Sequence, residues 1–280
     1  MKRKFLPLFP ALALLLALHA GAKESLKAEH VRVSWVAPKT FDLEAGATAG
    51  IRFVPDPGWH LYWKNPGDSG APPLFQLRAE GALCGEVGWP YPERMPYGSF
   101  VDLGYEGEVV FPFDVKPEGG GPARVEAKLE WAVCEEICIV GSGILTLERP
   151  VRTEEKWKSA ARARLLRYEA RVPRPSDESP WEIAEARLSP ERLVLTLKAK
   201  DGPRPPRAPE AFPVNGNLVL PQAPAVERAD GGFHLTFDVP GGVAPFASTG
   251  FVLVEDGRAW EFPSVPVAAE GFPPASRYVE

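Results

Sequence analysis

The sequence lacks an excess of positive charge. Its 32 lysines and arginines are outnumbered by 37 aspartates and glutamates, which leaves a formal net charge of -5. The basic residues are scattered along the chain, so the sequence offers no electrostatic footprint for nucleic acid. We therefore expect no nucleic-acid partner.

Hydrophobic runs long enough to cross a membrane are missing as well. The apolar run Phe5–Leu18 is shorter than the roughly 20 residues that a membrane-spanning helix needs, and no later run approaches that length. Three basic residues at 2–4 precede it and small residues at 20–22 follow it, which is typical of a cleaved secretory signal peptide. We predict a signal peptide over residues 1–22. After its removal we expect a chain that is neither membrane-embedded nor lipid-anchored.

Alternation of apolar and polar residues with a period of two recurs along the chain, and this pattern is typical of half-buried β-strands. It covers 109–115 and 125–133 in the first half, and 193–197 and 233–239 in the second half. Removal of 22 residues from 280 leaves about 258, a length that fits two domains. We predict an all-β protein with two immunoglobulin-like β-sandwich domains joined by a helical linker.

The linker is predicted where the chain has its one good helical pattern. Thr153 is a suitable N-cap, two glutamates follow it, and an apolar stripe continues to about Ala170. The stripe consists of Trp157, Ala161, Leu165 and Tyr168. We place the first domain at 23–151, the linker at 152–172 and the second domain at 173–280.

Two shorter patterns lie in the predicted second domain. The proline-rich stretch Gly202–Pro213 is predicted to be a long loop. The residues Glu255–Arg258 contain Asp-Gly between two apolar runs, which indicates a tight hairpin turn.

Cysteine is scarce, and two of the three cysteines stand four positions apart in LEWAVCEEICIV, residues 129–140. Residues four apart on one strand are separated by roughly 13 Å, whereas a disulfide accepts about 4.4 to 6.8 Å between Cα atoms. We therefore place a hairpin turn at 135–137, with Cys134 and Cys138 facing across it. The parity of the preceding strand puts Trp131 and Val133 inward, so we expect Cys134 to point outward, where a partner protein can meet it.

Spacing alone leaves three roles open for these cysteines. A structural disulfide, from Cys134 to Cys138 or from one of them to Cys84, is common in secreted proteins. A bond that closes so short a loop adds little chain-entropy stabilisation, which favours a redox role instead. A copper(I) site is the third possibility, because soft thiolates prefer copper(I). Residues 139–143 disfavour the helix found in copper chaperones of this spacing, and the chain has two methionines, so copper(I) binding is the second candidate function.

Four segments in order resemble one family. They are PGWHLYWKNPGDSGAPP (57–73), GWPYPERM (88–95), GYEGEVVFPFDV (104–115) and LEWAVCEEICIV (129–140). Over about residues 28–150 the chain resembles the periplasmic N-terminal domain of the DsbD and ScsB group of thiol:disulfide interchange proteins. The second half is similar, more weakly, to the additional sandwich of ScsB-like members. The resemblance implies an immunoglobulin-like domain that needs no cofactor.

The same resemblance implies a role for each cysteine of the motif. Cys134 and Cys138 would be the catalytic pair that passes electrons to oxidised periplasmic proteins, with Cys138 forming the mixed disulfides. The sequence ends at Glu280 without the family's membrane core or thioredoxin-like domain. We therefore expect a separate electron donor, a DsbD-like or CcdA-like membrane protein, with or without a thioredoxin-like protein. The client is left open between apocytochrome c, a disulfide isomerase, a peroxide-reducing enzyme and a copper-stress protein.

Family members shield the cysteine pair with a loop, and by position that loop is the aromatic segment 89–100. Its expected shielding residues are Tyr91, Met95, Tyr97 and Phe100.

A few further residues have competing interpretations. His60 and Tyr62 lie opposite the inward row of Trp59 and Trp63, and either border the cysteines or are surface residues without a chemical task. Cys84 lies outside the motif and is expected to be a buried free thiol or an incidental one. GDSGAPP at 67–73 is similar to the nucleophile segment of trypsin-like proteases, but no matching histidine motif precedes it, so we predict a turn.

Overall fold

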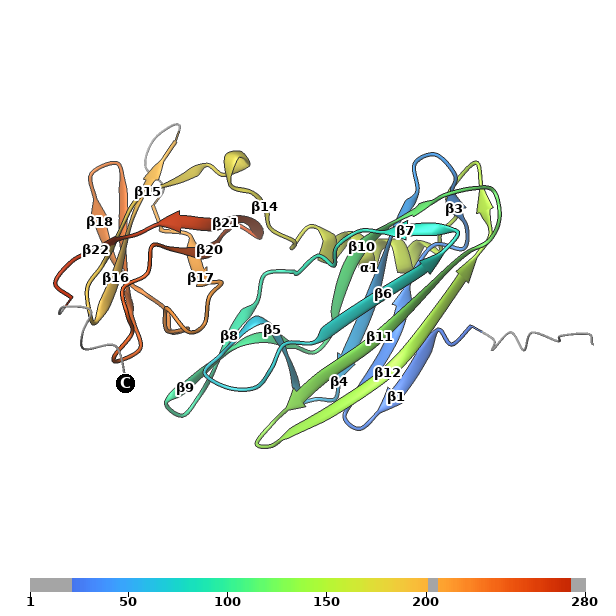
Figure 1. The fold of residues 1–280 in the computed structure, drawn as a ribbon, viewed down its shortest axis with the longest axis horizontal. Coiled ribbons are helices and arrows are strands. Elements are labelled where there is room, and N and C mark those ends of the chain that lie inside the picture. Colours follow the sequence, from blue (N-terminus) through green and yellow to red (C-terminus); the bar gives the residue numbers. More distant parts are fainter. Residues whose placement is uncertain (1–21, 201–205, 273–280) are drawn as a thin grey trace, which may run out of the picture.

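The computed structural model describes residues 22–200 and 206–272, and it has two β-sandwiches side by side (Figure 1). The predicted signal peptide therefore lies, apart from Ala22, outside the described residues. Within the described ranges no helix is long and apolar enough to cross a membrane.

The first domain consists of two antiparallel sheets that face each other. One sheet has the order β1 (Ser25–Ala28), β2 (Val31–Val36), β4 (Ala47–Pro55), β10 (Val109–Pro117) and β7 (Ala82–Cys84). The other has the order β12 (Cys138–Arg149), β11 (Ala123–Cys134), β5 (His60–Gly67), β9 (Phe100–Glu106) and β8 (Glu93–Tyr97), and β6 (Leu74–Glu80) also pairs with β11. A short parallel pair, β3 (Phe41–Asp42) and β13 (Val151–Arg152), closes one end.

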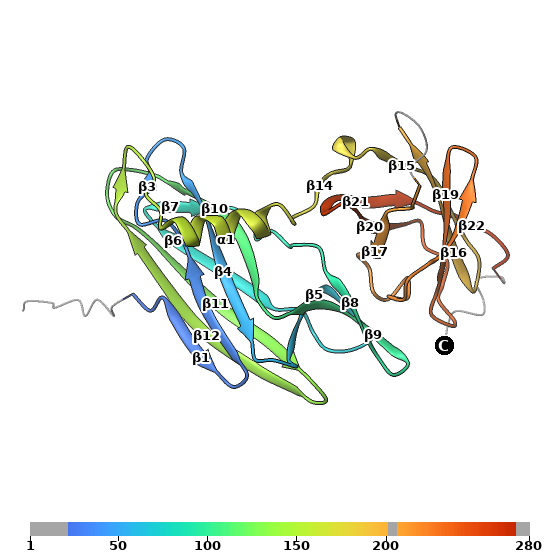
Figure 2. The ribbon, with the colours of Figure 1, turned by 180° about the vertical axis from the view of Figure 1, so that it is seen from behind.

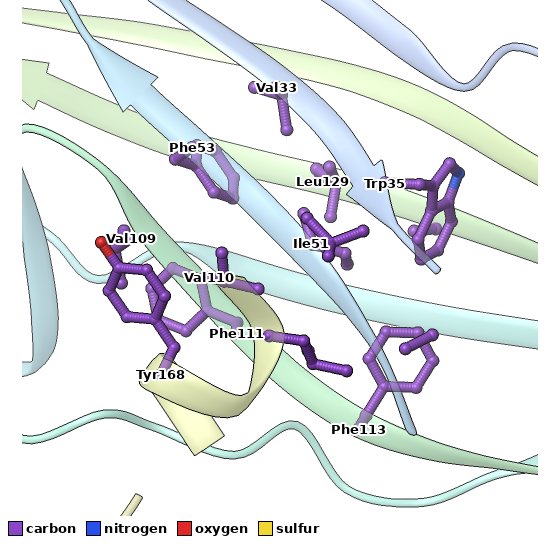
Figure 3. Close-up of a cluster of buried hydrophobic side chains, with 14 of the residues drawn as sticks. Val33, Trp35, Ile51, Phe53, Val109, Val110, Phe111, Phe113, Leu129 and Tyr168 are labelled. Atoms are coloured by element: carbon purple, nitrogen blue, oxygen red, sulfur yellow. The ribbon is translucent and has the colours of Figure 1, made fainter. Parts of the chain in front are cut away.

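Alternation places the apolar side chains of both sheets in one core, as predicted. The inward residues of 109–115 and 125–133 are buried there together with Trp59, Leu61 and Trp63. The ring of Phe53 meets Phe111 edge-on at 5.9 Å between centroids, and Trp131 at 5.7 Å. Figure 3 shows part of this core, with Phe53, Phe111 and Leu129 among the labelled side chains.

The helix α1 is shorter than predicted. It spans Ser159–Glu169 and begins after Lys158, which makes no side-chain cap, so Thr153 is not its N-cap. The segment before the helix is instead held by backbone hydrogen bonds to the first domain, with Leu43 donating to Arg152 at 2.8 Å and Lys39 donating to Lys156 at 2.6 Å. Tertiary pairing therefore prevails over local helix propensity at 151–156.

The helix packs on the first domain as well as connecting the two domains. Leu165 and Tyr168 of the predicted stripe are buried in the first core, and Figure 3 shows Tyr168 beside Val109 and Val110 of β10. Glu108 of the first domain accepts hydrogen bonds from Arg164 and Arg167 of α1. In Figure 2 the helix lies across β10, and the chain then runs to the second domain.

The second domain also has two sheets around a core of its own. The first sheet has the order β14 (Arg174–Pro175), β21 (Arg258–Pro266), β20 (Ser248–Glu255) and β17 (Glu210–Pro213). The second has the order β18 (Ala225–Ala229), β19 (Gly232–Asp238), β16 (Arg192–Ala199), β15 (Trp181–Leu188) and β22 (Ala268–Ala269). A 3-10 turn, Ser176–Glu178, precedes β15.

One prediction for this domain is confirmed and one is partly wrong. The turn between β20 and β21 has positive φ angles at Asp256, 49°, and Gly257, 75°, as a tight Asp-Gly hairpin requires. The predicted loop Gly202–Pro213 ends in a strand, because Ala211 and Phe212 are buried and β17 pairs with β20. β17 is at a sheet edge, where proline is tolerated because an edge strand leaves one side of its backbone unpaired.

The two domains are joined by an interface as well as by the chain. Phe212 and Val252 of the second domain are buried with the first core, and the Phe212 ring lies 6.5 Å from that of Trp63. Asn65 donates from Nδ2 to the Pro213 carbonyl at 2.7 Å. Arg94 of β8 donates from Nε to the carbonyl of Pro221 at 2.9 Å and from Nη2 to that of Ala211 at 2.5 Å. Its guanidinium also stacks on the Phe212 ring, 4.3 Å from the centroid.

Arg94→Ala should destabilise the protein by about 2 to 3 kcal/mol, because two carbonyl acceptors lose a charged donor at a buried interface. The measurement is the urea unfolding midpoint. Arg78→Ala, an exposed arginine on β6, is the matched control and should change stability by less than about 0.5 kcal/mol. Equal, small effects for both variants would show that Arg94 is not an interface anchor.

Candidate functional site

The two cysteines of the motif stand at the end of a long hairpin. β11 and β12 pair without interruption from Ala123 opposite Arg149 to Cys134 opposite Cys138. The turn 135–137 is where it was predicted, and Glu135 donates its backbone N–H to the Ile137 carbonyl at 3.2 Å. Cys134 and Cys138 form a disulfide with 4.1 Å between their Cα atoms, and Cys84 is free.

The two cysteines of this disulfide differ in exposure. Cys138 is exposed, whereas Cys134 is only 2% exposed, so the prediction that Cys134 is open to a partner is wrong. The strand parity predicted the face of the sheet correctly. Cys134 lies on the outer face, outside the main core, in a separate small cluster with Tyr62 and Ala132. Tyr62 and Ala132 pack with Cys134 on this outer face, so Cys138 is the exposed residue of the pair.

A pocket of about 510 Å³ lies beside the disulfide. Its wall comes from β5, the bend after β5, the hairpin of β8 and β9, and the turn between β11 and β12. The residues that line it are Gly58, His60, Tyr62, Ser69, Met95, Pro96, Tyr97, Phe100, Asp102, Glu106, Cys134, Glu135, Glu136 and Cys138. In both ribbon views the ends of the two hairpins lie on the same side of the first domain (Figures 1 and 2).

Most of the residues singled out from the sequence meet in this pocket. His60, Tyr62, Met95, Tyr97 and Phe100 all line it together with the cysteine pair. His60 and Tyr62 face away from the main core, as expected from the inward row of Trp59 and Trp63.

Tyr91 is not among these residues. Its ring lies under the guanidinium of Arg171, 4.6 Å from the ring centroid to Cζ, and its backbone N–H donates to the Arg171 carbonyl at 2.9 Å. Tyr91 packs at the edge of the first core, where it ties 89–92 to the segment that follows α1.

Two residues of the site, Ser69 and Asp102, were not predicted from the sequence. Asp102 is 6% exposed, and both of its carboxylate oxygens accept from Ser69 Oγ at 2.9 Å. Ser69 Oγ lies 3.3 Å from Tyr62 Oη, which lies 3.6 Å from Cys138 Sγ. The sequence does contain one clue to Asp102, because it is an acidic residue within the otherwise apolar strand 101–105. An acid there is buried and must find a donor.

Burial and negative charge dominate the electrostatics of the pocket. Burial lowers the pKa of His60 against the opposing effects of Asp102 and Glu106, so the imidazole is neutral at pH 7. Burial also raises the pKa of Tyr62, whose hydroxyl keeps its proton. Among the described residues that line the pocket there are four carboxylates and neither lysine nor arginine. In the described ranges no three His, Cys, Asp or Glu side chains are grouped to hold a metal ion.

Fold and site together define an immunoglobulin-like domain with a disulfide at the end of a surface hairpin. Residues 27–149 match the family described as thiol:disulfide interchange protein DsbD, N-terminal. This part of the chain belongs to that family, as the resemblance of the four segments indicated.

Solved structures extend the likeness in fold to the second domain. The N-terminal periplasmic domain of ScsB from Proteus mirabilis is 19% identical, with a TM-score of 0.64, and the match covers 88% of this chain and 98% of that one. The periplasmic chaperone SfaE is 11% identical over 85% of this chain and 100% of that one. The tandem immunoglobulin repeats of Dlar are 11% identical over 86% and 99%. The TM-scores of these two, 0.20 and 0.23, are too low to support an argument. No curated protein sequence matches.

The reactivity of Cys84 tests the assignment of Cys134 and Cys138 to the disulfide and of Cys84 as the free thiol. Burial raises its pKa to about 11, so roughly one thiol in a thousand is ionised at pH 8. In the oxidised protein we expect one slowly alkylated thiol per chain, with a rate that rises about tenfold per pH unit up to about pH 10. Mass spectrometry after timed iodoacetamide treatment measures this, and Cys84→Ser should abolish the labelling. Labelling at pH 7.5 as fast as that of a small free thiol would contradict the assignment.

Proposed function

We propose that this protein carries electrons from a membrane reductant to oxidised periplasmic proteins through reversible opening of the Cys134–Cys138 disulfide. The observation that carries the proposal is the difference in exposure between the two cysteines: Cys138 is exposed at the hairpin turn, and Cys134 is buried. Family membership of residues 27–149 supports the reaction class. The bond spans a three-residue turn between strands that already pair along their whole length, so it adds little as a structural link.

The exchange takes place at Cys138 in both directions. A partner thiolate attacks Cys138 Sγ, and Cys134 leaves as a thiolate that takes up a proton. A second thiolate of the partner then attacks the partner sulfur that is bonded to Cys138. Cys138 is released in the reduced form, and the partner is left with a disulfide. In delivery, the Cys138 thiolate attacks a client disulfide, and Cys134 then attacks Cys138 Sγ. The bond is restored, and the client keeps two thiols.

Partners of this kind need a surface on which to dock near Cys138. Ile137, 67% exposed, and Val140, 81% exposed, flank it on the β11–β12 hairpin, and Tyr97 and Phe100 are exposed on the opposite side of the pocket. Exposed apolar side chains gathered around a reactive group are typical of an interaction site. We assign this rim to a thioredoxin-like protein or to a DsbD-like or CcdA-like membrane donor. Location in the periplasm is part of the proposal and is supported by the predicted signal peptide.

We further propose that Met95, Tyr97 and Phe100 shield the disulfide, and that Tyr91 supports the base of this segment. Tyr97 and Phe100 face each other across the tip of the β8–β9 hairpin, and Met95 is buried below them. The chemistry is assigned to the first domain, residues 23–151. The second domain serves as a spacer or docking surface and holds Arg94 at the base of the same hairpin.

Tyr97→Ser combined with Phe100→Ser should speed alkylation of reduced Cys138 by a bulky maleimide several-fold, because two large side chains leave the pocket rim. Iodoacetamide, a small reagent, should gain less. Leu74→Ser, which removes an exposed apolar side chain on β6, is the control and should leave both rates unchanged. Equal maleimide rates in the double variant and the unaltered protein would remove the shielding role.

A redox titration with thiol counting by mass tests the function itself. The thiol count should rise reversibly from one to three per chain, with a midpoint near or above about -250 mV. Cys138→Ser should abolish the transition. A midpoint below roughly -300 mV would indicate a structural bond. Copper(I) bound tightly at one equivalent, without disulfide turnover, would favour the copper-binding alternative.

A further inference from the structure

A line of polar groups leads from Cys138, the exposed cysteine of the disulfide, into the protein. Cys138 Sγ lies 3.6 Å from Tyr62 Oη, and Tyr62 Oη lies 3.3 Å from Ser69 Oγ. Ser69 Oγ lies 2.9 Å from both oxygens of Asp102. Gly70 lets the tyrosine ring lie against the backbone, because a Cβ at Gly70 would be 2.0 Å from Cζ of the ring. The line therefore ends on a carboxylate and is held in place along its length.

The inventory of protons gives this line a direction. An ionised carboxylate can only accept hydrogen bonds, so the hydroxyl of Ser69 donates its one proton to Asp102. The Ser69 backbone N–H also donates to Asp102, at 3.0 Å, which fixes the carboxylate as an acceptor. Tyr62 must then donate to Ser69 Oγ for the two hydroxyls to bond. What Tyr62 presents to Cys138 is therefore the lone pairs of its oxygen. The disulfide sulfur carries no proton either, so the 3.6 Å contact becomes a hydrogen bond only when Cys138 is reduced to a thiol.

This direction matters once the disulfide is reduced. A Cys138 thiol can donate its S–H to the Tyr62 oxygen, whereas a Cys138 thiolate needs a donor. The only proton that Tyr62 can offer is the one it gives to Ser69. We propose that Asp102 is a positioning residue that acts through Ser69 and Tyr62 to keep reduced Cys138 protonated. This inference rests on the proposed function, in which the reduced form must hold its electrons until a partner docks.

Other charges near Cys138 act in the same direction. Glu135 and Glu136 face the pocket from the turn, Asp102 and Glu106 from β9, and His60 from β5 is neutral. His60 Nε2 lies 3.7 Å from Asp102 Oδ2 without a hydrogen bond, so it does not take over the role of Ser69. We call the hydrogen-bonded groups Asp102, Ser69 and Tyr62 the relay. A test of the relay must change its hydrogen bonds and leave every charge in place.

Ser69→Ala and Tyr62→Phe meet this condition, because both remove a hydroxyl and no charge. The background is Cys84→Ser with Cys134→Ser, which leaves Cys138 as the one thiol. Ser69→Ala frees the Tyr62 proton for the thiolate, so the pH–rate profile of iodoacetamide alkylation should move to lower pH. The rate at pH 7 should rise roughly three- to tenfold, which corresponds to about half a unit to one unit of pKa.

The decisive result is the coupling between the two positions. With Phe at 62 there is no hydroxyl proton to release, so Ser69→Ala should have no effect on the profile in that background. Ser69→Thr restores a hydroxyl and should return the profile to that of the unaltered chain. No shift for Ser69→Ala, or the same shift with and without Tyr62, would overturn the relay.

Failure of the relay and failure of the carrier function can be told apart. A reversible disulfide titration together with an unshifted Ser69→Ala profile would overturn the relay and leave the function standing. A coupled shift in a protein whose disulfide does not titrate reversibly would support the relay around Cys138 and overturn the function. Ser69 is exposed at a bend, so Ser69→Ala should fold, and unchanged circular dichroism and urea midpoint check this.

Discussion

The register of the β11–β12 hairpin is the constraint on which the site depends. Twelve consecutive pairs run from Ala123 and Arg149 to Cys134 and Cys138, and alternate side chains of β11 fill the core. A slip of one residue would turn this whole apolar row to the outside, so burial of the core fixes the register. Because the register is fixed, the two cysteines meet across the turn. The core therefore places the disulfide without contributing an atom to it.

Periodicity in the sequence predicts the strands and their faces, but it fails where a second layer or a distant segment intervenes. Two sandwiches and the faces of His60 and Tyr62 are predicted by alternation, the turn at 135–137 by the cysteine spacing, and the family by the four segments. The burial of Cys134 is not, because alternation gives the face of a strand and not the layer that covers it. The start of α1 fails for a similar reason: backbone pairing with residues 39–43 is invisible in the local pattern. Asp102 carried a signal, an acid in an apolar strand, but its partner Ser69 is 33 positions away.

The second domain reaches the site through the base of the β8–β9 hairpin. Arg94 is anchored in the second domain, and the next residue, Met95, already lines the pocket. Asp68 makes a parallel link, because its Oδ2 accepts both the Val101 N–H at 2.8 Å and Nε2 of Gln222 at 3.0 Å. Both links hold the base of the hairpin, and neither involves its tip residues Tyr97 and Phe100.

The charges around the disulfide bear on the direction of electron flow. A thiol:disulfide protein becomes a strong oxidant when its reduced form is stabilised, and a cation beside the thiolate is the usual means. Here the described residues that line the pocket include four carboxylates and no lysine or arginine, and in the proposed line of polar groups the Tyr62 oxygen presents lone pairs to Cys138. Both features disfavour the Cys138 thiolate and so leave the reduced pair without that stabilisation. A reduced cysteine pair without this stabilisation gives up its electrons more readily than the pair of a strongly oxidising thiol:disulfide protein. The proposed function, donation of electrons to oxidised clients, requires this property.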